Sequence, residues 1–198
     1  VTYEKLPTPV FDGNAWQWSP DIVPSLQTQS NCPHHCNFCA ISKGSDTFLQ
    51  SPRTMSAKRI VDHIAAITTT TGANRFDIVD ETFDISRQLA LGKDLKKRGH
   101  EATWSCYLTI TPNLTDPDLC TKLFDAGCRN VQLGLESLSS ATLDREHKRW
   151  NKPDLYSSIL RNLKGAGIQT HIFILLGLPG EPLSEGLHWL PWIEDNAE

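Results

Sequence analysis

Residues 32–39 of this 198-residue chain read Cys-Pro-His-His-Cys-Asn-Phe-Cys, which places three thiols within eight residues. Their spacing, C-x3-C-x2-C, allows three sulfurs to surround one face of a small metal cluster. The fourth corner of such a cluster receives no ligand from this stretch, and an open coordination position is typical of metal centres that do chemistry. The cysteine loop, residues 32–39, therefore predicts an iron–sulfur centre with one position left for another molecule.

The cysteine loop leaves a second interpretation open, in which its thiolates form most of a structural zinc site. His34 or His35 would then supply the fourth ligand, because structural zinc is held by cysteine and histidine. Both histidines lie inside the loop, where reaching back to the same metal would strain the backbone. A non-catalytic interaction module that binds zinc or an inert iron–sulfur cluster is therefore the alternative from a different functional class.

The overall composition is that of an ordinary globular protein and excludes several classes of partner. Hydrophobic residues make up 39% of the chain and charged residues 21%. The formal net charge is −4, so no electropositive field favours nucleic acid, and we expect no such partner. The longest strongly apolar run, residues 172–178, is too short to cross a bilayer, and the first residues lack the apolar region of a signal peptide. We therefore expect no membrane partner.

The use of cysteine indicates a reducing compartment. Six cysteines could form a disulfide framework in a small secreted protein, but this chain is of medium length and shows no secretion signal. Three of them are also too close together for unstrained disulfides with one another. We therefore expect a cytoplasmic protein whose thiols bind metal. Outside the loop, Cys120 and Cys128 are expected to be buried as small apolar side chains, and core packing is also favoured for Cys106.

Short apolar segments alternate with longer segments of helical periodicity along the chain. This alternation predicts parallel strands joined by right-handed crossovers. About five βα units are too few for a closed eight-stranded barrel, so the predicted fold is α/β, an open and partial (β/α) barrel. The expected strands cover residues 22–29, 75–79, 102–108, 129–135 and 169–176, and the expected helices cover residues 57–68, 86–98, 115–126, 139–147, 154–166 and 183–195.

Polar and reactive residues follow each predicted strand. In parallel α/β folds the carboxyl ends of the strands meet at one edge and carry the functional site. The cysteine loop, which follows the first strand, should therefore share this edge with residues that follow the other four. A carboxylate directly after an apolar strand, as at Glu136, is the strongest of these signals. The residues concerned are Asp80, Glu81, Tyr107, Glu136 and Gly177.

The combination of these motifs resembles the radical S-adenosylmethionine (SAM) superfamily over residues 20–195. The resemblance rests on the cysteine loop with its Phe38, on Asp80-Glu81, on Gly134-Leu-Glu136-Ser137 and on Gly177-Leu-Pro-Gly-Glu181. It implies a radical SAM enzyme in which Cys32, Cys36 and Cys39 hold three irons of a [4Fe–4S] cluster, while the methionine amine and carboxylate of SAM chelate the fourth. The reduced cluster would cleave SAM to methionine and a 5′-deoxyadenosyl radical, which abstracts hydrogen from a substrate.

The resemblance also implies roles for the predicted site residues. Phe38 would pack against the adenine ring, and Gly177, with Leu175, would let the backbone approach the adenine edge. Glu136 would bind the ribose hydroxyls or the methionine amine. Lys148 lies where some members supply a cation to the methionine carboxylate, although its position in a charge run favours a solvated side chain.

Two adjacent carboxylates are candidates for one further role. Either Asp80 or Glu81 would accept a hydrogen bond from the methionine amine, because a carboxylate and an ammonium form a strong, charge-assisted pair. The two residues stand where the family more commonly has Gly-Gly-Glu, so both remain candidates.

The resemblance further implies partners and a larger protein. Reduction requires an electron donor such as flavodoxin or ferredoxin, and the substrate would be a small molecule or a peptide. Residues 1–21, rich in Pro, Asp, Gly and Trp, indicate a linker, and residues 22–198 form the core. The family's usual sixth βα unit and a starting Met are both missing, which predicts a segment of a longer protein. The linker resembles the one that follows a cobalamin-binding-type domain in many members. A cobalamin-dependent radical SAM methyltransferase, with cobalamin on a domain outside this chain, is therefore the alternative within enzymes.

Overall fold

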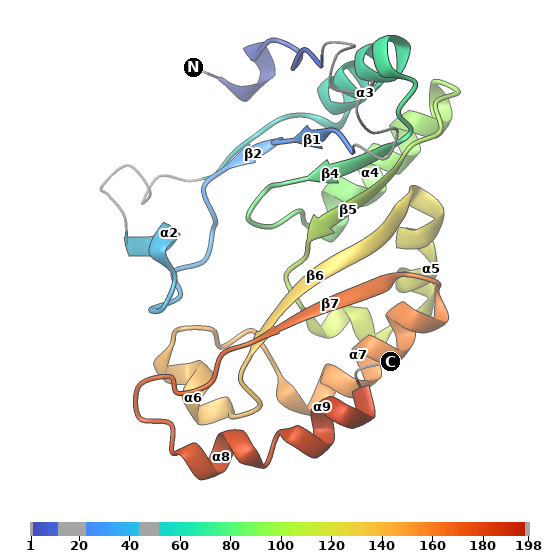
Figure 1. Ribbon diagram of the computed structural model, residues 1–198. Coiled ribbons are helices and arrows are strands. Elements are labelled where there is room, and N and C mark those ends of the chain that lie inside the picture. Colours follow the sequence, from blue (N-terminus) through green and yellow to red (C-terminus); the bar gives the residue numbers. More distant parts are fainter. Residues whose placement is uncertain (1, 12–22, 44–51, 197–198) are drawn as a thin grey trace.

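The computed structural model describes residues 2–11, 23–43 and 52–196, and its centre is a five-stranded parallel sheet (Figure 1). The strand order is β1-β4-β5-β6-β7, and every neighbouring pair is parallel. The sheet is open, with β1 and β7 at its two edges, which confirms the expected α/β fold with an open sheet. The five strands are β1 (Ser25–Leu26), β4 (Arg75–Ile78), β5 (Thr103–Tyr107), β6 (Cys128–Glu136) and β7 (Gln169–Ile174).

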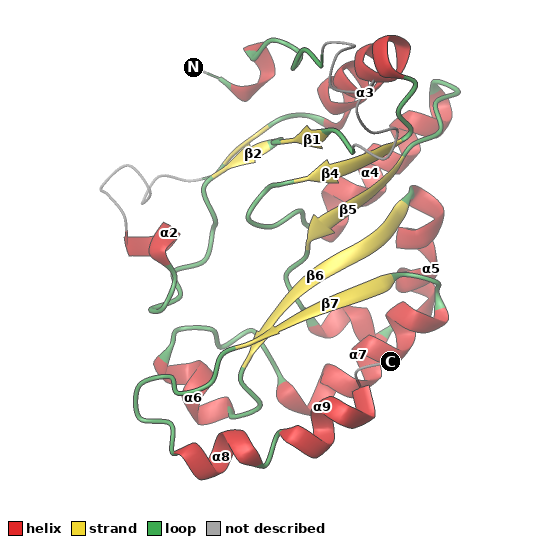
Figure 2. Cartoon of the chain, viewed as in Figure 1, coloured by secondary structure: helices red, strands yellow, loops and turns green. Residues whose placement is uncertain are grey.

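Helices cover one face of this sheet, as Figure 2 shows, and four long helices lie in the connections between successive parallel strands. The end residues of α3 (Ala57–Thr71) show how these helices are capped. The side chain of Ser56 accepts a hydrogen bond from the backbone N–H of Arg59 at 3.2 Å, and Gly72 closes the same helix in the left-handed conformation. The four long helices are α3 (Ala57–Thr71), α4 (Ile85–Lys97), α5 (Pro117–Ala126) and α7 (Tyr156–Gly165).

The remaining elements are short. Two strands, β2 (Gln29–Ser30) and β3 (Arg53–Thr54), form a separate antiparallel pair. No helix among the described residues combines the length and the apolar character that a membrane-spanning segment needs. The short helices are η1 (Tyr3–Lys5), α2 (Ala40–Lys43), η2 (Pro112–Thr115), α6 (Ser140–Arg145), η3 (Pro153–Leu155), α8 (Leu183–Leu187) and α9 (Leu190–Asn196).

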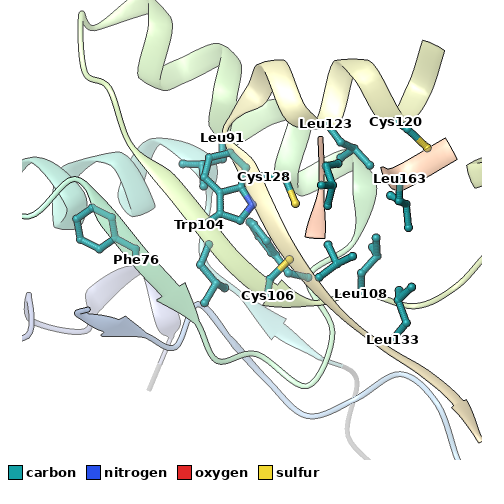
Figure 3. Close-up of a cluster of buried hydrophobic side chains, with 14 of the residues drawn as sticks. Phe76, Leu91, Trp104, Cys106, Leu108, Cys120, Leu123, Cys128, Leu133 and Leu163 are labelled. Atoms are coloured by element: carbon teal, nitrogen blue, oxygen red, sulfur yellow. The ribbon is translucent and has the colours of Figure 1, made fainter. Parts of the chain in front are cut away.

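The hydrophobic core lies between the sheet and the long helices. Alternate strand residues point toward the helices, so Phe76, Trp104 and Val131 are buried there. Figure 3 shows Cys106 and Cys128 among these apolar side chains. The expected core packing of the cysteines outside the loop is therefore confirmed, because all three are buried in this cluster.

The opposite face of the sheet is polar and accessible. Asp77, Ser105 and Gln132 alternate with the buried strand residues and are only partly buried, and Tyr107 is exposed. Ser105 pairs with Asp77 in the β4–β5 register, and its hydroxyl donates to the Asp77 carboxylate. Tyr107 and Gln132 of this face line the same cavity as the cysteine loop.

The segment expected as one strand over residues 22–29 is divided between two sheets. Residue 22 lies outside the described residues, and the β1 ladder ends at Leu26. The cause is long-range: the backbone N–H groups of Thr28 and Gln29 donate to the Asp80 carboxylate at 2.5 and 2.8 Å. These amides are therefore not available to continue a ladder with β4, and the chain turns into β2.

The helix expected over residues 183–195 is two short helices, α8 and α9. Pro191 is the second residue of α9 and has no backbone N–H, so it cannot donate to the carbonyl of Leu187. Proline is tolerated in the first turn of a helix, where that donor would have no partner. The break between the helices therefore follows from one residue.

Part of the predicted linker packs against α3. Arg59 donates to the carbonyl of Leu6 at 2.7 Å, and the Nδ1 atom of His63 lies 2.9 Å from Thr8 Oγ1. Residues 12–21 of the linker lie outside the described residues. The division of the chain at residue 21 stays a prediction.

Candidate metal and cofactor site

A cavity of about 470 Å³ lies where the cysteine loop passes the carboxyl ends of β4, β5 and β6. It is lined by all three cysteines of the loop and by four other residues that the sequence predicts for the site, Phe38, Glu81, Tyr107 and Glu136. Asp80 and Gly177, which were also predicted, do not line it. The fold therefore brings most of the candidates together.

The thiols of the cysteine loop are suited to binding metal. None of the six cysteines, all of which the structure describes, forms a disulfide. Burial raises the pKa of the Cys36 thiol to about 11, and burial also raises the pKa of Cys32. A metal centre that binds these sulfurs must therefore displace protons, and the thiolate–metal bonds offset that cost. Soft thiolate ligands of this kind favour iron–sulfur clusters or zinc.

The histidines of the loop do not complete a site for a single metal ion. The ring of His34 stacks on Trp150 at 4.0 Å, and His35 is exposed. Within residues 2–11, 23–43 and 52–196, no three Cys, His, Asp or Glu side chains converge closely enough to surround one ion. A four-iron cluster holds each thiolate on a different iron, so its ligands are spread more widely. The arrangement therefore favours a cluster over structural zinc.

Asp80 is a buried structural carboxylate. Its oxygens accept hydrogen bonds from the Thr28 backbone N–H and hydroxyl, both at 2.5 Å, and from the Gln29 N–H at 2.8 Å. Arg87 also pairs with it at 3.1 Å. Burial raises the pKa of Asp80, whereas these donors favour the ionised form. Asp80 thus joins the chain after β1 to the end of β4 and has its oxygens occupied.

Glu81, the next residue, lines the cavity. Its Oε2 atom is buried and accepts no hydrogen bond from the described residues. Leaving a buried acceptor without a donor costs about 1–3 kcal/mol, and more for a charged group. A cationic donor bound in the cavity would remove this cost.

Glu136 and Lys148 form a largely buried ion pair at the cavity. Lys148 Nζ lies 2.8 Å from Glu136 Oε1, and the two side chains are only 12% and 11% exposed. The sequence-based expectation that Lys148 is solvated is therefore wrong, because its partner lies twelve residues earlier, at the end of β6. Lys148 Nζ also lies 5.8 Å from the centre of the Phe38 ring.

Backbone strain is concentrated around the cavity. Within the described ranges, the non-glycine residues with positive φ are Asn31 at 64°, Glu136 at 66° and His147 at 57°. Asn31 precedes Cys32, and His147 precedes Lys148, so each lies beside a cavity residue. Such conformations cost roughly 1–3 kcal/mol each and persist where the surrounding structure holds them. At Glu136 the β6–β7 register also shifts, and such a bulge re-aims a side chain.

Gly177 lies in a turn after β7 and does not line the cavity. It is exposed with φ 78°, and its N–H donates to Glu181 Oε2 at 3.0 Å. The other oxygen of Glu181 accepts from the Ser137 hydroxyl at 3.3 Å. The motif from Gly177 to Glu181 therefore links the loop after β7 to the loop after β6.

Gly134, His34 and Trp150 are among the lining residues that were not predicted for the site. Gly134 had a sequence signal, because a lone glycine within a strand often marks a close approach. A methyl group there would overlap the Glu136 carboxylate and lie 2.7 Å from Lys148 Nζ. His34 was considered only as a zinc ligand, and Trp150 had no signal, because its role depends on the stacking partner.

Comparisons with known proteins identify the family. A model of the Radical SAM superfamily matches residues 26–190, which is most of the chain. The bacteriochlorophyllide d C-8(2)-methyltransferase of Chlorobaculum tepidum is 32% identical over 144 residues, which cover 69% of this chain and 31% of that protein.

Two solved structures have the same fold. One is the radical SAM methyltransferase TsrM from Kitasatospora setae with cobalamin and a [4Fe–4S] cluster bound, with TM-score 0.73, 18% identity and coverage of 88% of this chain and 35% of that one. The other is the cobalamin-dependent SAM radical enzyme OxsB with aqua-cobalamin and SAM bound, with TM-score 0.74, 21% identity and coverage of 96% and 29%.

The chain spans about a third of the length of the relatives it matches. The match to the family model nevertheless covers the cysteine loop and all but the first residue of the parallel sheet. Together with the open (β/α) fold, this shows that the chain belongs to the radical SAM superfamily, whose enzymes use a [4Fe–4S] cluster and SAM.

Proposed function

We propose that this chain is the radical-generating core of its enzyme, with a [4Fe–4S] cluster on Cys32, Cys36 and Cys39 and SAM in the adjoining cavity. The observation that carries the proposal is the cavity. Three thiols line it together with a largely buried lysine and with Glu81, whose buried Oε2 atom accepts no hydrogen bond from the part of the chain that the structure describes. When bound and reduced, the cluster supplies the electron that cleaves SAM and so starts hydrogen abstraction from a substrate.

The cavity residues offer a separate contact to each part of SAM. Glu81 would accept from the methionine amine through its buried oxygen. Lys148 has three N–H donors, so it can keep its bond to Glu136 and also bind the methionine carboxylate. Phe38 would offer its ring to the adenine, and the second oxygen of Glu136 would accept from a ribose hydroxyl.

Replacing Gly134 with alanine should test this arrangement. The added methyl group would displace the far ends of the Glu136 and Lys148 side chains, which are flexible, so the fold should lose less than about 1 kcal/mol. The displaced Lys148 would bind the methionine carboxylate less well. Losing a charged hydrogen bond of about 1.5 kcal/mol should weaken SAM binding roughly tenfold. Isothermal titration of the anaerobically reconstituted protein with SAM, beside a thermal unfolding curve, measures both quantities.

Gly165→Ala is the matched control. Gly165 is exposed at the end of α7 and has open space around it, so alanine there should leave SAM affinity unchanged. If Gly134→Ala binds SAM as tightly as Gly165→Ala, the ion pair of Glu136 and Lys148 does not contact SAM.

Anaerobic reconstitution with iron and sulfide tests the proposed function as a whole. We expect about four irons and four sulfides per chain, and release of 5′-deoxyadenosine after reduction with SAM. One zinc per chain without iron–sulfur absorption would support the structural-module alternative instead.

A cobalamin-dependent methyltransferase is the second candidate. It is supported by the relatives, among them a methyltransferase with bound cobalamin, and by the chain's span of about a third of their lengths. In such a reaction a methyl group leaves SAM for cobalamin, and S-adenosylhomocysteine remains. The full-length protein with cobalamin should then form S-adenosylhomocysteine in proportion to methylated product. Formation of 5′-deoxyadenosine alone would favour the first candidate.

The open side of the cavity is aromatic, which supports a substrate that is a small molecule or a peptide with an apolar group. Tyr107 and Phe173 both line the cavity, and their rings stack at 6.2 Å with an interplanar angle of 17°. Tyr107 is 39% exposed, although large aromatic rings are usually buried. A substrate that covers these rings would remove apolar surface from water.

The partners and the location follow from the same chemistry. A flavodoxin or ferredoxin would deliver the electron, and the net charge of −4 argues against nucleic acid as a substrate. Absence of disulfides among six cysteines supports a reducing compartment such as the cytoplasm. We place a linker at residues 1–21 and the core at residues 22–198.

A further inference from the structure

The cysteine loop is held by a segment more than a hundred residues away in the sequence. The backbone N–H of Asn37 donates to the carbonyl of Glu146 at 3.1 Å, and its side-chain amide donates to the carbonyl of Arg145 at 2.7 Å. Both acceptors belong to residues 145–150, which begin with the last residue of α6 and which we name the α6 turn. Two hydrogen bonds therefore attach the loop to the α6 turn.

His34 makes a second contact with the α6 turn. Its ring lies 4.0 Å from the ring of Trp150, with an angle of 22° between their planes. Its Nε2 atom lies 3.3 Å from Thr109 Oγ1, and that hydroxyl lies 2.8 Å from Thr82 Oγ1. His34 is thus fixed between the α6 turn and residues that follow β4 and β5.

The α6 turn also carries the cation of the cavity. Lys148 is part of it and pairs with Glu136 at 2.8 Å. The neighbouring Asn151 donates to the carbonyls of Gly134 and Leu135 at 2.9 and 3.1 Å, which attaches the end of the turn to β6. One short segment therefore sets both the position of the cysteine loop and the position of Lys148.

We propose that His34 and Trp150 are positioning residues, whose stacked rings hold the cysteine loop on the α6 turn and so keep the thiols and Lys148 in a fixed arrangement. This inference rests on the proposed function, because it assigns the contact a purpose in holding a cluster beside SAM. Neither residue is part of the buried hydrophobic core, so the contact is not needed to form the sheet.

His34→Ala should loosen the cluster without unfolding the protein. Loss of a stacked pair should speed the release of iron to a chelator roughly threefold to tenfold. We also expect the reduced cluster to give a broader paramagnetic resonance spectrum, with a smaller change when SAM is added. His34→Phe keeps an aromatic ring over Trp150 and should restore most of the wild-type behaviour.

His35→Ala is the matched control, because the adjacent residue has the same chemistry but is exposed. It should release iron at the wild-type rate. Trp150→Ala should reproduce His34→Ala, and the double variant should be no worse than either single one, because both remove the same contact. Trp150→Phe, which keeps a ring, should behave as wild type.

The outcomes separate this inference from the proposed function. If the wild-type protein holds no cluster, the proposed function fails. If the wild type holds a cluster and His34→Ala releases iron and responds to SAM as His35→Ala does, only the inference fails. Equal losses in His34→Ala and His34→Phe would also overturn it, since the stacking would then be irrelevant.

Discussion

Alanine in place of Cys32, Cys36 or Cys39 is expected to abolish cluster loading and, with it, cleavage of SAM. Each of these thiols lines the cavity, and each is assigned to a different iron of the cluster. A cluster that loses one of its three protein ligands is bound too weakly to stay in the protein. Iron and sulfide content after anaerobic reconstitution, and 5′-deoxyadenosine after reduction, measure the two losses.

Cys120→Ala is the control for these three variants. Cys120 is a buried residue of α5, and its thiol donates to the carbonyl of Leu114 at 3.5 Å, so it has a packing role away from the cavity. We expect it to keep both the cluster and the cleavage activity largely intact. Equal loss in all four variants would mean that the ligands are wrongly assigned.

Glu81→Gln and Asp80→Asn are expected to have opposite effects, although the two residues are adjacent. Glu81→Gln removes a charged acceptor from the cavity and should weaken SAM binding roughly tenfold to a hundredfold, with little change in stability. Asp80→Asn leaves Arg87 without its buried partner and should cost about 3–5 kcal/mol of unfolding free energy. SAM titration and denaturant unfolding of each variant measure both effects.

The reversed result would be informative. Tight SAM binding by Glu81→Gln, together with a stable Asp80→Asn that no longer binds SAM, would assign the methionine amine to Asp80. Thr28→Val tests the structural role of Asp80 separately, because it removes a hydroxyl that donates to that carboxylate. It should lower stability by about 1–2 kcal/mol and leave SAM affinity unchanged.

Local patterns were sufficient to predict the order of strands and helices. Ser56 before α3 and Gly72 after it are capping signals contained in a few residues, and both cap that helix in the structure. The first strand was predicted too long, because its end depends on Asp80, about fifty residues later. The single C-terminal helix was also wrong, although Pro191 gave a local signal for the break.

The type of site and its edge of the sheet could be predicted from the sequence, but the roles of some of its residues could not. The cysteine spacing and the carboxylates after strands indicate which edge of the sheet is functional. They do not say which of Asp80 and Glu81 faces the cavity, because Thr28, Gln29 and Arg87 decide it through long-range contacts. Lys148 was misjudged for the same reason, since a charge run looks solvated until its buried partner is known.

The most direct test of the central claim is whether the methionine end of SAM binds the cluster that the cysteine loop holds. Reduced, reconstituted protein would be mixed with SAM labelled with nitrogen-15 at the methionine amine and studied by electron–nuclear double resonance. The account predicts a nitrogen coupling strong enough for a direct iron–nitrogen bond, and no such signal in Cys36→Ala. A cluster whose spectrum is the same with and without labelled SAM, in protein that binds SAM, would contradict the account.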